Sequence, residues 1–167
     1  KIRTRFDNGR GEVPLIAMAP GASWLGRKWP TERFAVLATR LQRQGGLFDG
    51  HRLLIVGEAA DHDTLVALSM ATPRAMIMER QLEPDAVTGE QTDYLDIYAA
   101  LRHASLFVGN DEIWLSLAAA AGVPSFGLYG PSDEAGAATR VHPLRGPRSF
   151  EDIHAVDPKL KSTGCHM

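Results

Sequence analysis

The sequence lacks the features of a disulfide-stabilised secreted protein and those of a membrane-spanning one. Its only cysteine is Cys165, so no internal disulfide can form, and a reducing compartment is expected. No apolar run reaches the roughly 18 residues that a spanning helix needs, and no signal-peptide pattern opens the chain. The formal net charge of −2 gives no overall attraction to nucleic acid or to anionic membranes. Any affinity for phosphate must therefore come from a local site.

Cofactor and metal signatures are also missing. Cys165 and His166 have no further cysteine or histidine at ligand spacing, so we expect neither a metal site nor a cofactor. The P-loop pattern G-x-x-x-x-G-K-[ST] does not occur, and no strand leads into the G-x-G-x-x-G of a dehydrogenase-type domain. Four histidines stand apart from any nucleophile or carboxylate at diagnostic spacing, and we interpret them as surface or capping residues: His62, His103, His142 and His154.

Short apolar runs alternate with helical patterns along most of the chain. The runs predict strands at residues 15–19, 53–56, 75–78, 106–108 and 125–129. Between them, amphipathic spacing predicts helices that begin at Thr31, after an Asp61 cap, after a Thr92 cap, and at residues 113–121. Beyond Glu134 the pattern indicates only loops and at most a short edge strand.

Strands that are apolar throughout and separated by helices are typical of a parallel sheet covered on both faces. The predicted fold class is therefore α/β, with a Rossmann-like parallel sheet. The helix at 113–121 is apolar nearly all round, and we expect it to be buried. Ligands bind outside the carboxyl ends of such strands. This rule points to the loops at residues 20–29, 57–61, 109–112 and 130–133.

The loop that follows the first strand, PGASWLGRKWP, has the composition of a phosphate site. Gly21 and Gly26 allow close backbone approach, Ser23 offers a hydroxyl, and Arg27 and Lys28 bring positive charge. The helix start that follows adds free N–H groups and a partial positive charge. The alternative is a solvated loop whose cations only face water.

Two further strand ends carry acidic residues. Asp111, after Gly109 and Asn110, is predicted to cap the next helix, and that helix start could be a second anion site. Glu112 argues against this function, because it would repel a phosphate there. Glu58 could accept hydrogen bonds from two ribose hydroxyls, or it could simply be solvated.

Taken together, three segments resemble the C-terminal half of bacterial ADP-heptose:lipopolysaccharide heptosyltransferases in order and spacing. They are PGASWLGRKWPTERFAVLATRL, VGEAAD and FVGNDEIWLSLAAAAGVPSFGLYGPSD, and the similarity covers residues 13–134. The resemblance implies one half of a GT-B glycosyltransferase, in which two Rossmann-like domains enclose the active site. Residues 1–12 would be an N-terminal extension or interdomain segment, and residues 13–167 the nucleotide-sugar-binding domain. Because neither end has the features of a natural terminus, we expect a piece of a longer polypeptide that lacks the acceptor domain.

The resemblance also assigns roles to the residues of the first loop. Gly21, Ala22, Ser23 and Lys28 would bind the phosphates of an ADP-sugar donor. Lys28 would also be catalytic, because its ammonium would neutralise the diphosphate leaving group.

The other strand ends would complete the donor site. Glu58 would hold the ribose, and the backbone near Thr92 would lie beside the adenine. Asp111, the second expected catalytic residue, would lie at the sugar–phosphate end of the donor, with Glu112 next to it.

The family's reaction inverts the anomeric centre without a metal, and its general base is usually in the N-terminal domain. The implied acceptor is a saccharide or lipopolysaccharide core, bound through that absent domain. The implied location is the cytoplasm or the inner face of the bacterial inner membrane, with at most peripheral membrane contact and no nucleic-acid partner.

One departure from the family keeps an alternative open. Where the family usually has Asp-Ser/Thr-Gly-x-x-His, this chain has DEIWLS at residues 111–116. Ile113 carries a branched side chain where glycine would allow close approach to phosphate, and Ser116 cannot supply an imidazolium. The chain could therefore be a degenerate, non-catalytic GT-B-like binding or scaffold module.

Overall fold

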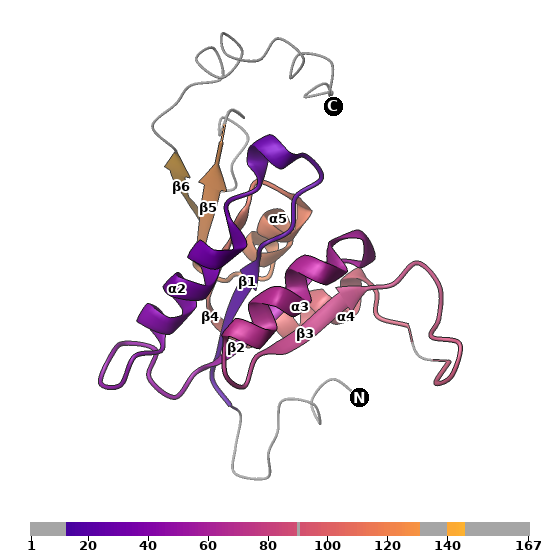
Figure 1. Cartoon of the computed structure of the whole chain (residues 1–167), viewed down its shortest axis with the longest axis horizontal. Coiled ribbons are helices and arrows are strands. Elements are labelled where there is room, and N and C mark those ends of the chain that lie inside the picture. The colour runs from indigo at the N-terminus through magenta and orange to yellow at the C-terminus, as the bar shows by residue number, and fades with distance from the viewer. Residues whose placement is uncertain (1–12, 90, 131–139, 146–167) are drawn as a thin grey trace, which may run out of the picture.

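The computed structural model describes residues 13–89, 91–130 and 140–145. These residues form a six-stranded sheet in the order β3-β2-β1-β4-β5-β6 (Figure 1). All five strand pairings are parallel, which confirms the predicted α/β class. The strands are β1 (Leu15–Ala19), β2 (Arg52–Glu58), β3 (Met76–Arg80), β4 (Ala104–Asn110), β5 (Ser125–Tyr129) and β6 (Val141–Arg145).

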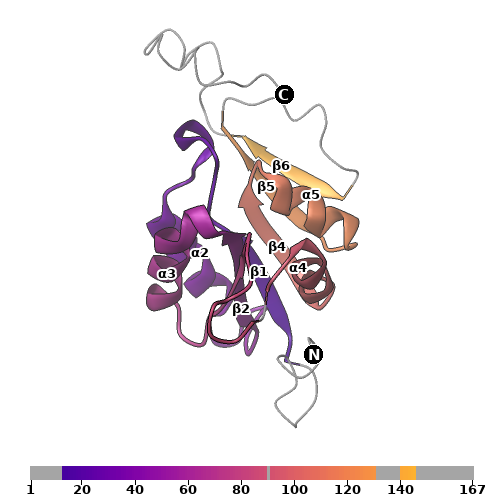
Figure 2. The ribbon, with the colours of Figure 1, turned by 90° about the vertical axis from the view of Figure 1, so that its right-hand side faces the viewer.

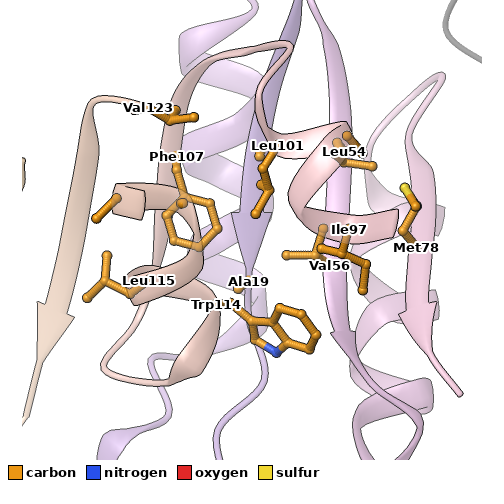
Figure 3. Packing of buried hydrophobic residues seen from close by; sticks show 14 of the residues in the cluster. Ala19, Leu54, Val56, Met78, Ile97, Leu101, Phe107, Trp114, Leu115 and Val123 are labelled. Carbon is orange, nitrogen blue, oxygen red and sulfur yellow. The ribbon is translucent and has the colours of Figure 1, made fainter. Parts of the chain in front are cut away.

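Helices cover both faces of this sheet. The helices α2 (Thr31–Leu41) and α3 (His62–Ala71) lie on one face, and α4 (Tyr94–Leu101) and α5 (Ile113–Ala120) lie on the other (Figure 2). Strand β1 is buried throughout and sends alternate side chains to the two sides. Ile16 and Met18 belong to the α2/α3 cluster. Leu15, Ala17 and Ala19 belong to the α4/α5 cluster, part of which is drawn in Figure 3.

The strand order reverses at β1, which pairs with β2 on one side and with β4 on the other. At such a switch point the loops after neighbouring strands diverge to opposite faces and leave room for a ligand. Ala19 pairs with Gly109, so the loop after β1 starts beside the end of β4. The sheet topology therefore brings together the two loops that the sequence singled out.

The cap of α4 differs from the prediction. Asp93, not Thr92, is the N-cap residue. Its carboxylate accepts from the Asp96 N–H at 2.9 Å, while the Asp96 carboxylate accepts from the Asp93 N–H at 3.2 Å. This reciprocal capping box satisfies two backbone donors, which the single hydroxyl of Thr92 could not do.

Helix α5 corrects two further predictions. Its N-cap residue is Glu112 and not Asp111, and the Glu112 side chain makes no capping hydrogen bond. Trp114 is buried, but Ile113 is 51% exposed, so the helix is not buried all round. It is an outer layer over one face of the sheet, and among the described residues no further layer covers it.

The remaining helices and strands occur where the sequence predicted them, with ends that differ by a few residues. Strand β4 continues through Gly109 and Asn110, which were expected to form a turn. Asp61 occupies the N-cap position of α3 as predicted, but its side chain makes no capping hydrogen bond. The edge strand expected late in the chain is β6.

Some residues singled out in the sequence lie outside the described part of the chain: Pro131 to Glu134, His154, Cys165 and His166. Within the described ranges, no helix is long and apolar enough to cross a bilayer.

Candidate functional site

A single buried side chain holds both ends of the first loop. Asn110, at the end of β4, is fully buried. Its amide nitrogen donates to the carbonyls of Pro20 at 3.0 Å and Gly21 at 3.1 Å. Its amide oxygen accepts from the Trp29 N–H at 3.1 Å. All of the amide's polar atoms are used within the protein, so Asn110 fixes where the loop starts and where it ends.

The middle of the first loop is bound by Glu112. One oxygen of this carboxylate, Oε1, accepts from the Ser23 N–H at 2.9 Å and from the Ser23 hydroxyl at 2.8 Å. The Arg27 guanidinium lies 4.0 Å from the same oxygen and 3.9 Å from the Asp111 carboxylate. The structure thus joins the two predicted phosphate-binding segments through a carboxylate that the sequence predicted to repel phosphate.

The Lys28 ammonium points towards the start of α3. Its Nζ donates to the Thr64 hydroxyl at 2.7 Å and lies 3.9 Å from Asp61 Oδ1. Because an ammonium has three donors, these contacts leave Lys28 capacity for another acceptor.

Asp61 packs directly against the loop backbone. A Cβ added to Gly21 would clash with the Asp61 carboxylate, so a larger residue at this position would have to displace the Asp61 side chain. Burial raises the pKa of Asp61, while Lys28 and a hydrogen bond from the Ala22 backbone N–H oppose that rise.

Glu58 forms a second cluster at the end of β2. Its Oε2 accepts from Arg80 Nε at 2.7 Å, and its Oε1 accepts from the Tyr94 hydroxyl at 3.1 Å. Glu58 pairs with Arg80 across β2 and β3, and the guanidinium carbon lies 4.5 Å from the Tyr94 ring centroid. The contact with Glu58 raises the pKa of Arg80, and burial raises the pKa of Tyr94. A carboxylate oxygen has two lone pairs, so Glu58 can still accept from a ligand hydroxyl.

The remaining predicted site residues lie around these two clusters. Thr92 is hydrogen-bonded to Gln81, whose N–H donates to the Thr92 carbonyl at 3.0 Å, and it stands two residues before Tyr94. Asp111 is near the buried Tyr129, whose pKa is raised first by burial and then by the Asp111 charge. His62 is exposed and pairs with Glu79 at 2.6 Å, which raises its pKa and confirms it as a surface residue.

A cavity of about 300 Å³ lies between the end of the first loop and the strands β5 and β6. Arg27, Lys28 and Trp29 line it from the loop, and Tyr129 and Arg145 line it from β5 and β6. Ser23, Glu58 and Asp111 are not among its lining residues. Of the predicted donor-site residues, Lys28 lines this cavity.

The structure brings Gly21, Ala22, Ser23, Lys28, Asp111 and Glu112 into one cluster, with Glu58 and Thr92 beside Tyr94 next to it. Sequence reasoning missed the parts played by Asp61, Thr64, Arg80 and Asn110. Asp61 had a visible signal, since it ends the VGEAAD segment after a strand, but it was interpreted only as a cap. No group of three or more potential metal ligands occurs in the part of the chain that the structure describes.

Comparison with known proteins identifies a family whose sequence model matches most of this chain. The family model described as glycosyltransferase family 9 (heptosyltransferase) matches residues 2–144. Lipopolysaccharide heptosyltransferase 2 of Salmonella typhimurium strain LT2 is 29% identical over 164 residues, which cover 93% of this chain and 42% of that protein. The chain therefore spans less than half the length of this curated relative.

Solved structures share the fold. The structure of E. coli ADP-heptose LPS heptosyltransferase II matches with a TM-score of 0.61 and 22% identity, over 87% of this chain and 43% of that one. E. coli heptosyltransferase WaaC with ADP-2-deoxy-2-fluoro heptose matches with a TM-score of 0.65 and 17% identity, over 98% of this chain and 47% of that one. Both are matched over a part less than half their length.

Proposed function

Because this chain belongs to glycosyltransferase family 9, we propose that it is the donor-binding part of a glycosyltransferase. The donor is an ADP-sugar that carries heptose or a related sugar, and the acceptor is a saccharide of lipopolysaccharide-core type. The names of the similar proteins support this substrate class, since one was solved with an ADP-heptose analogue. The acceptor binds through a second domain, because the chain spans only 42% of its curated relative.

The position of the first loop is the observation that carries this proposal. The loop lies at the end of β1, where the strand order reverses. Its Ser23 N–H and hydroxyl both donate to the one carboxylate of Glu112, and Lys28 contacts Asp61, which accepts from the neighbouring Ala22 N–H. Backbone and hydroxyl donors beside an ammonium at such a switch point suit a diphosphate. Glu58, at the end of the next strand, is placed to accept from ribose hydroxyls.

The chemistry assigned to this half is stabilisation of the leaving group. As the bond from the sugar to the diphosphate breaks, negative charge develops on the diphosphate oxygens. The Lys28 ammonium lowers the cost of that charge, with Asp111 at the sugar–phosphate end. The reaction is inverting and independent of metal, and the general base belongs to the absent domain. The enzyme acts in the cytoplasm or at the inner face of the inner membrane.

Glu112 favours a second candidate, a non-catalytic binding or scaffold module with the same fold. Its carboxylate already occupies the Ser23 donors at 2.8 and 2.9 Å. If that contact is permanent, no phosphate can reach them.

Calorimetry with ADP separates the two candidates. We expect Lys28→Ala to weaken ADP binding by about tenfold or more, because it removes a charge-assisted contact with phosphate. Arg40→Ala, which removes one positive charge in the last turn of α2, is the matched control and should leave the affinity unchanged. An unaltered affinity in Lys28→Ala would exclude the phosphate role of this loop. No binding by the parent chain at millimolar ADP would favour the scaffold module.

A further inference from the structure

The donors of the first loop are already engaged by acidic side chains of the same chain. The Ser23 N–H and hydroxyl both donate to Glu112, and the Ala22 N–H donates to Asp61. These partners come from different parts of the fold: Asp61 follows β2, and Glu112 follows β4. Two carboxylates therefore converge on backbone and hydroxyl donors that would suit a bound anion.

Glu112 differs from Asp61 in how it is held. It is the N-cap residue of α5, yet its side chain does not cap that helix and reaches the loop 89 residues earlier. A single oxygen accepts two hydrogen bonds, which is how a phosphate oxygen is bound by a loop with a backbone N–H and a hydroxyl. The side chain is 18% exposed, so it lies at the surface and can rotate into solvent.

We propose that Glu112 is a specificity-determining residue which occupies the anion position of the first loop, so that a phosphorylated ligand must displace its carboxylate while an unphosphorylated nucleoside need not. The proposal rests on the proposed function only for the nucleoside. The competition between Glu112 and an inorganic anion follows from the contacts of Ser23 alone.

The competition has a simple physical origin. The Ser23 N–H has one hydrogen and its hydroxyl has one, and both are directed at Glu112 Oε1. While Glu112 holds this position, a phosphate oxygen cannot accept from these two donors and is also repelled by the negative carboxylate. Displacement moves the Glu112 carboxylate into water and leaves Arg27, whose guanidinium lies 4.0 Å from the bound carboxylate, beside the incoming anion. Neutralising or removing Glu112 therefore strengthens anion binding selectively.

The test measures the binding of pyrophosphate, ADP and adenosine by calorimetry to the parent chain, Glu112→Ala and Glu112→Gln. We expect Glu112→Ala to bind pyrophosphate and ADP about tenfold more tightly and adenosine with unchanged affinity. Glu112→Gln keeps an acceptor for Ser23 but loses the charge, so its gain should be smaller. Asp49→Asn, in the turn before β2 where Asp49 accepts from the Gly45 N–H, is the control for losing one negative charge.

A second measurement does not need the alanine variant to fold. In the parent chain, added pyrophosphate should move the NMR shift of the Ser23 amide as the anion replaces Glu112. In Glu112→Gln the same change should occur at a lower pyrophosphate concentration, because the negative charge that opposes the anion is gone.

The outcomes separate this inference from the proposed function. Pyrophosphate affinity that is equal in all variants, or a Ser23 amide that responds to the same pyrophosphate concentration in the parent and in Glu112→Gln, overturns the inference. Equal ADP affinity in the parent and Glu112→Ala also overturns it, while leaving the nucleotide site standing. A selective gain for pyrophosphate with no ADP binding in any variant upholds the role of Glu112 and overturns the proposed donor.

Discussion

At the scale of single residues, the site depends on polar groups whose partners are far away in the sequence. Asn110 holds the loop 81 to 90 residues before it, and Glu112 reaches Ser23 across 89 residues. Asn110 is the last residue of β4 and Glu112 stands two residues after it, where the backbone hydrogen bonds of the sheet have ended. Asn110 is buried and Glu112 is partly exposed, so we expect the first residue to act on stability and propose that the second acts on binding.

Replacing Asn110 with alanine should lower the free energy of unfolding by about 2–4 kcal/mol, because it leaves two carbonyls and one N–H of the loop without partners. Gln42→Ala, which removes a single part-buried hydrogen bond to the His51 carbonyl, should cost about 1 kcal/mol. Urea unfolding measures both. A smaller loss in Asn110→Ala than in Gln42→Ala would show that the loop does not depend on this amide.

At the scale of elements, the apolar pattern fixes where helices and strands occur, and side-chain competition fixes their ends. Helix α4 begins after Asp93 because the Asp93–Asp96 capping box supplies two bonds. Helix α5 begins after Glu112 although that residue does not cap it, since its side chain is used by Ser23. An acidic residue at an N-cap position can therefore cap its own helix, as Asp93 does, or bind a distant partner instead, as Glu112 does.

Asp93→Ala should destabilise the chain by about 1 kcal/mol, as loss of an N-cap side chain does. Thr92→Ala, at the position that the sequence favoured as the cap, should change stability by less than about 0.5 kcal/mol. Thermal unfolding followed by circular dichroism distinguishes them. Comparable losses in both variants would mean that the capping box is not what fixes the start of α4.

At the scale of the whole molecule, one buried sheet separates two apolar clusters. Phe34 belongs to the cluster under α2 and α3, and Phe107 belongs to the cluster under α4 and α5. Both side chains are fully buried, and the shared strand β1 contributes residues to each cluster. Neither cluster can open without exposing one face of that strand, which predicts a single cooperative unfolding transition.

Phe34→Ala and Phe107→Ala should each lower stability by about 3–5 kcal/mol, from lost burial and a residual cavity. In both variants, tryptophan fluorescence and far-UV circular dichroism should report the same urea midpoint. Val36→Ala, on the exposed side of α2, is the control and should have an effect below about 0.5 kcal/mol. Separate midpoints for the two probes would show that the clusters unfold independently.

The sequence by itself determined the class of the fold and the positions of most elements. Uniformly apolar strands such as Leu15–Ala19 can be satisfied only by a sheet covered on both faces, and the alternating helical segments make that sheet parallel. The same reasoning located the ligand loops, because parallel strands end at one edge.

The tertiary structure alone decided which side chains meet at that edge. Glu112 was expected to repel phosphate, and its bond to Ser23 became visible only when β1 and β4 were placed side by side. Arg80 and Tyr94 reach Glu58 for the same reason, through register and packing between β2, β3 and α4. Local pattern specifies which face each residue lies on. Contacts between residues far apart in the sequence, such as Ser23 and Glu112 at 89 positions or Glu58 and Arg80 at 22, depend on strand order and register, which no local pattern encodes.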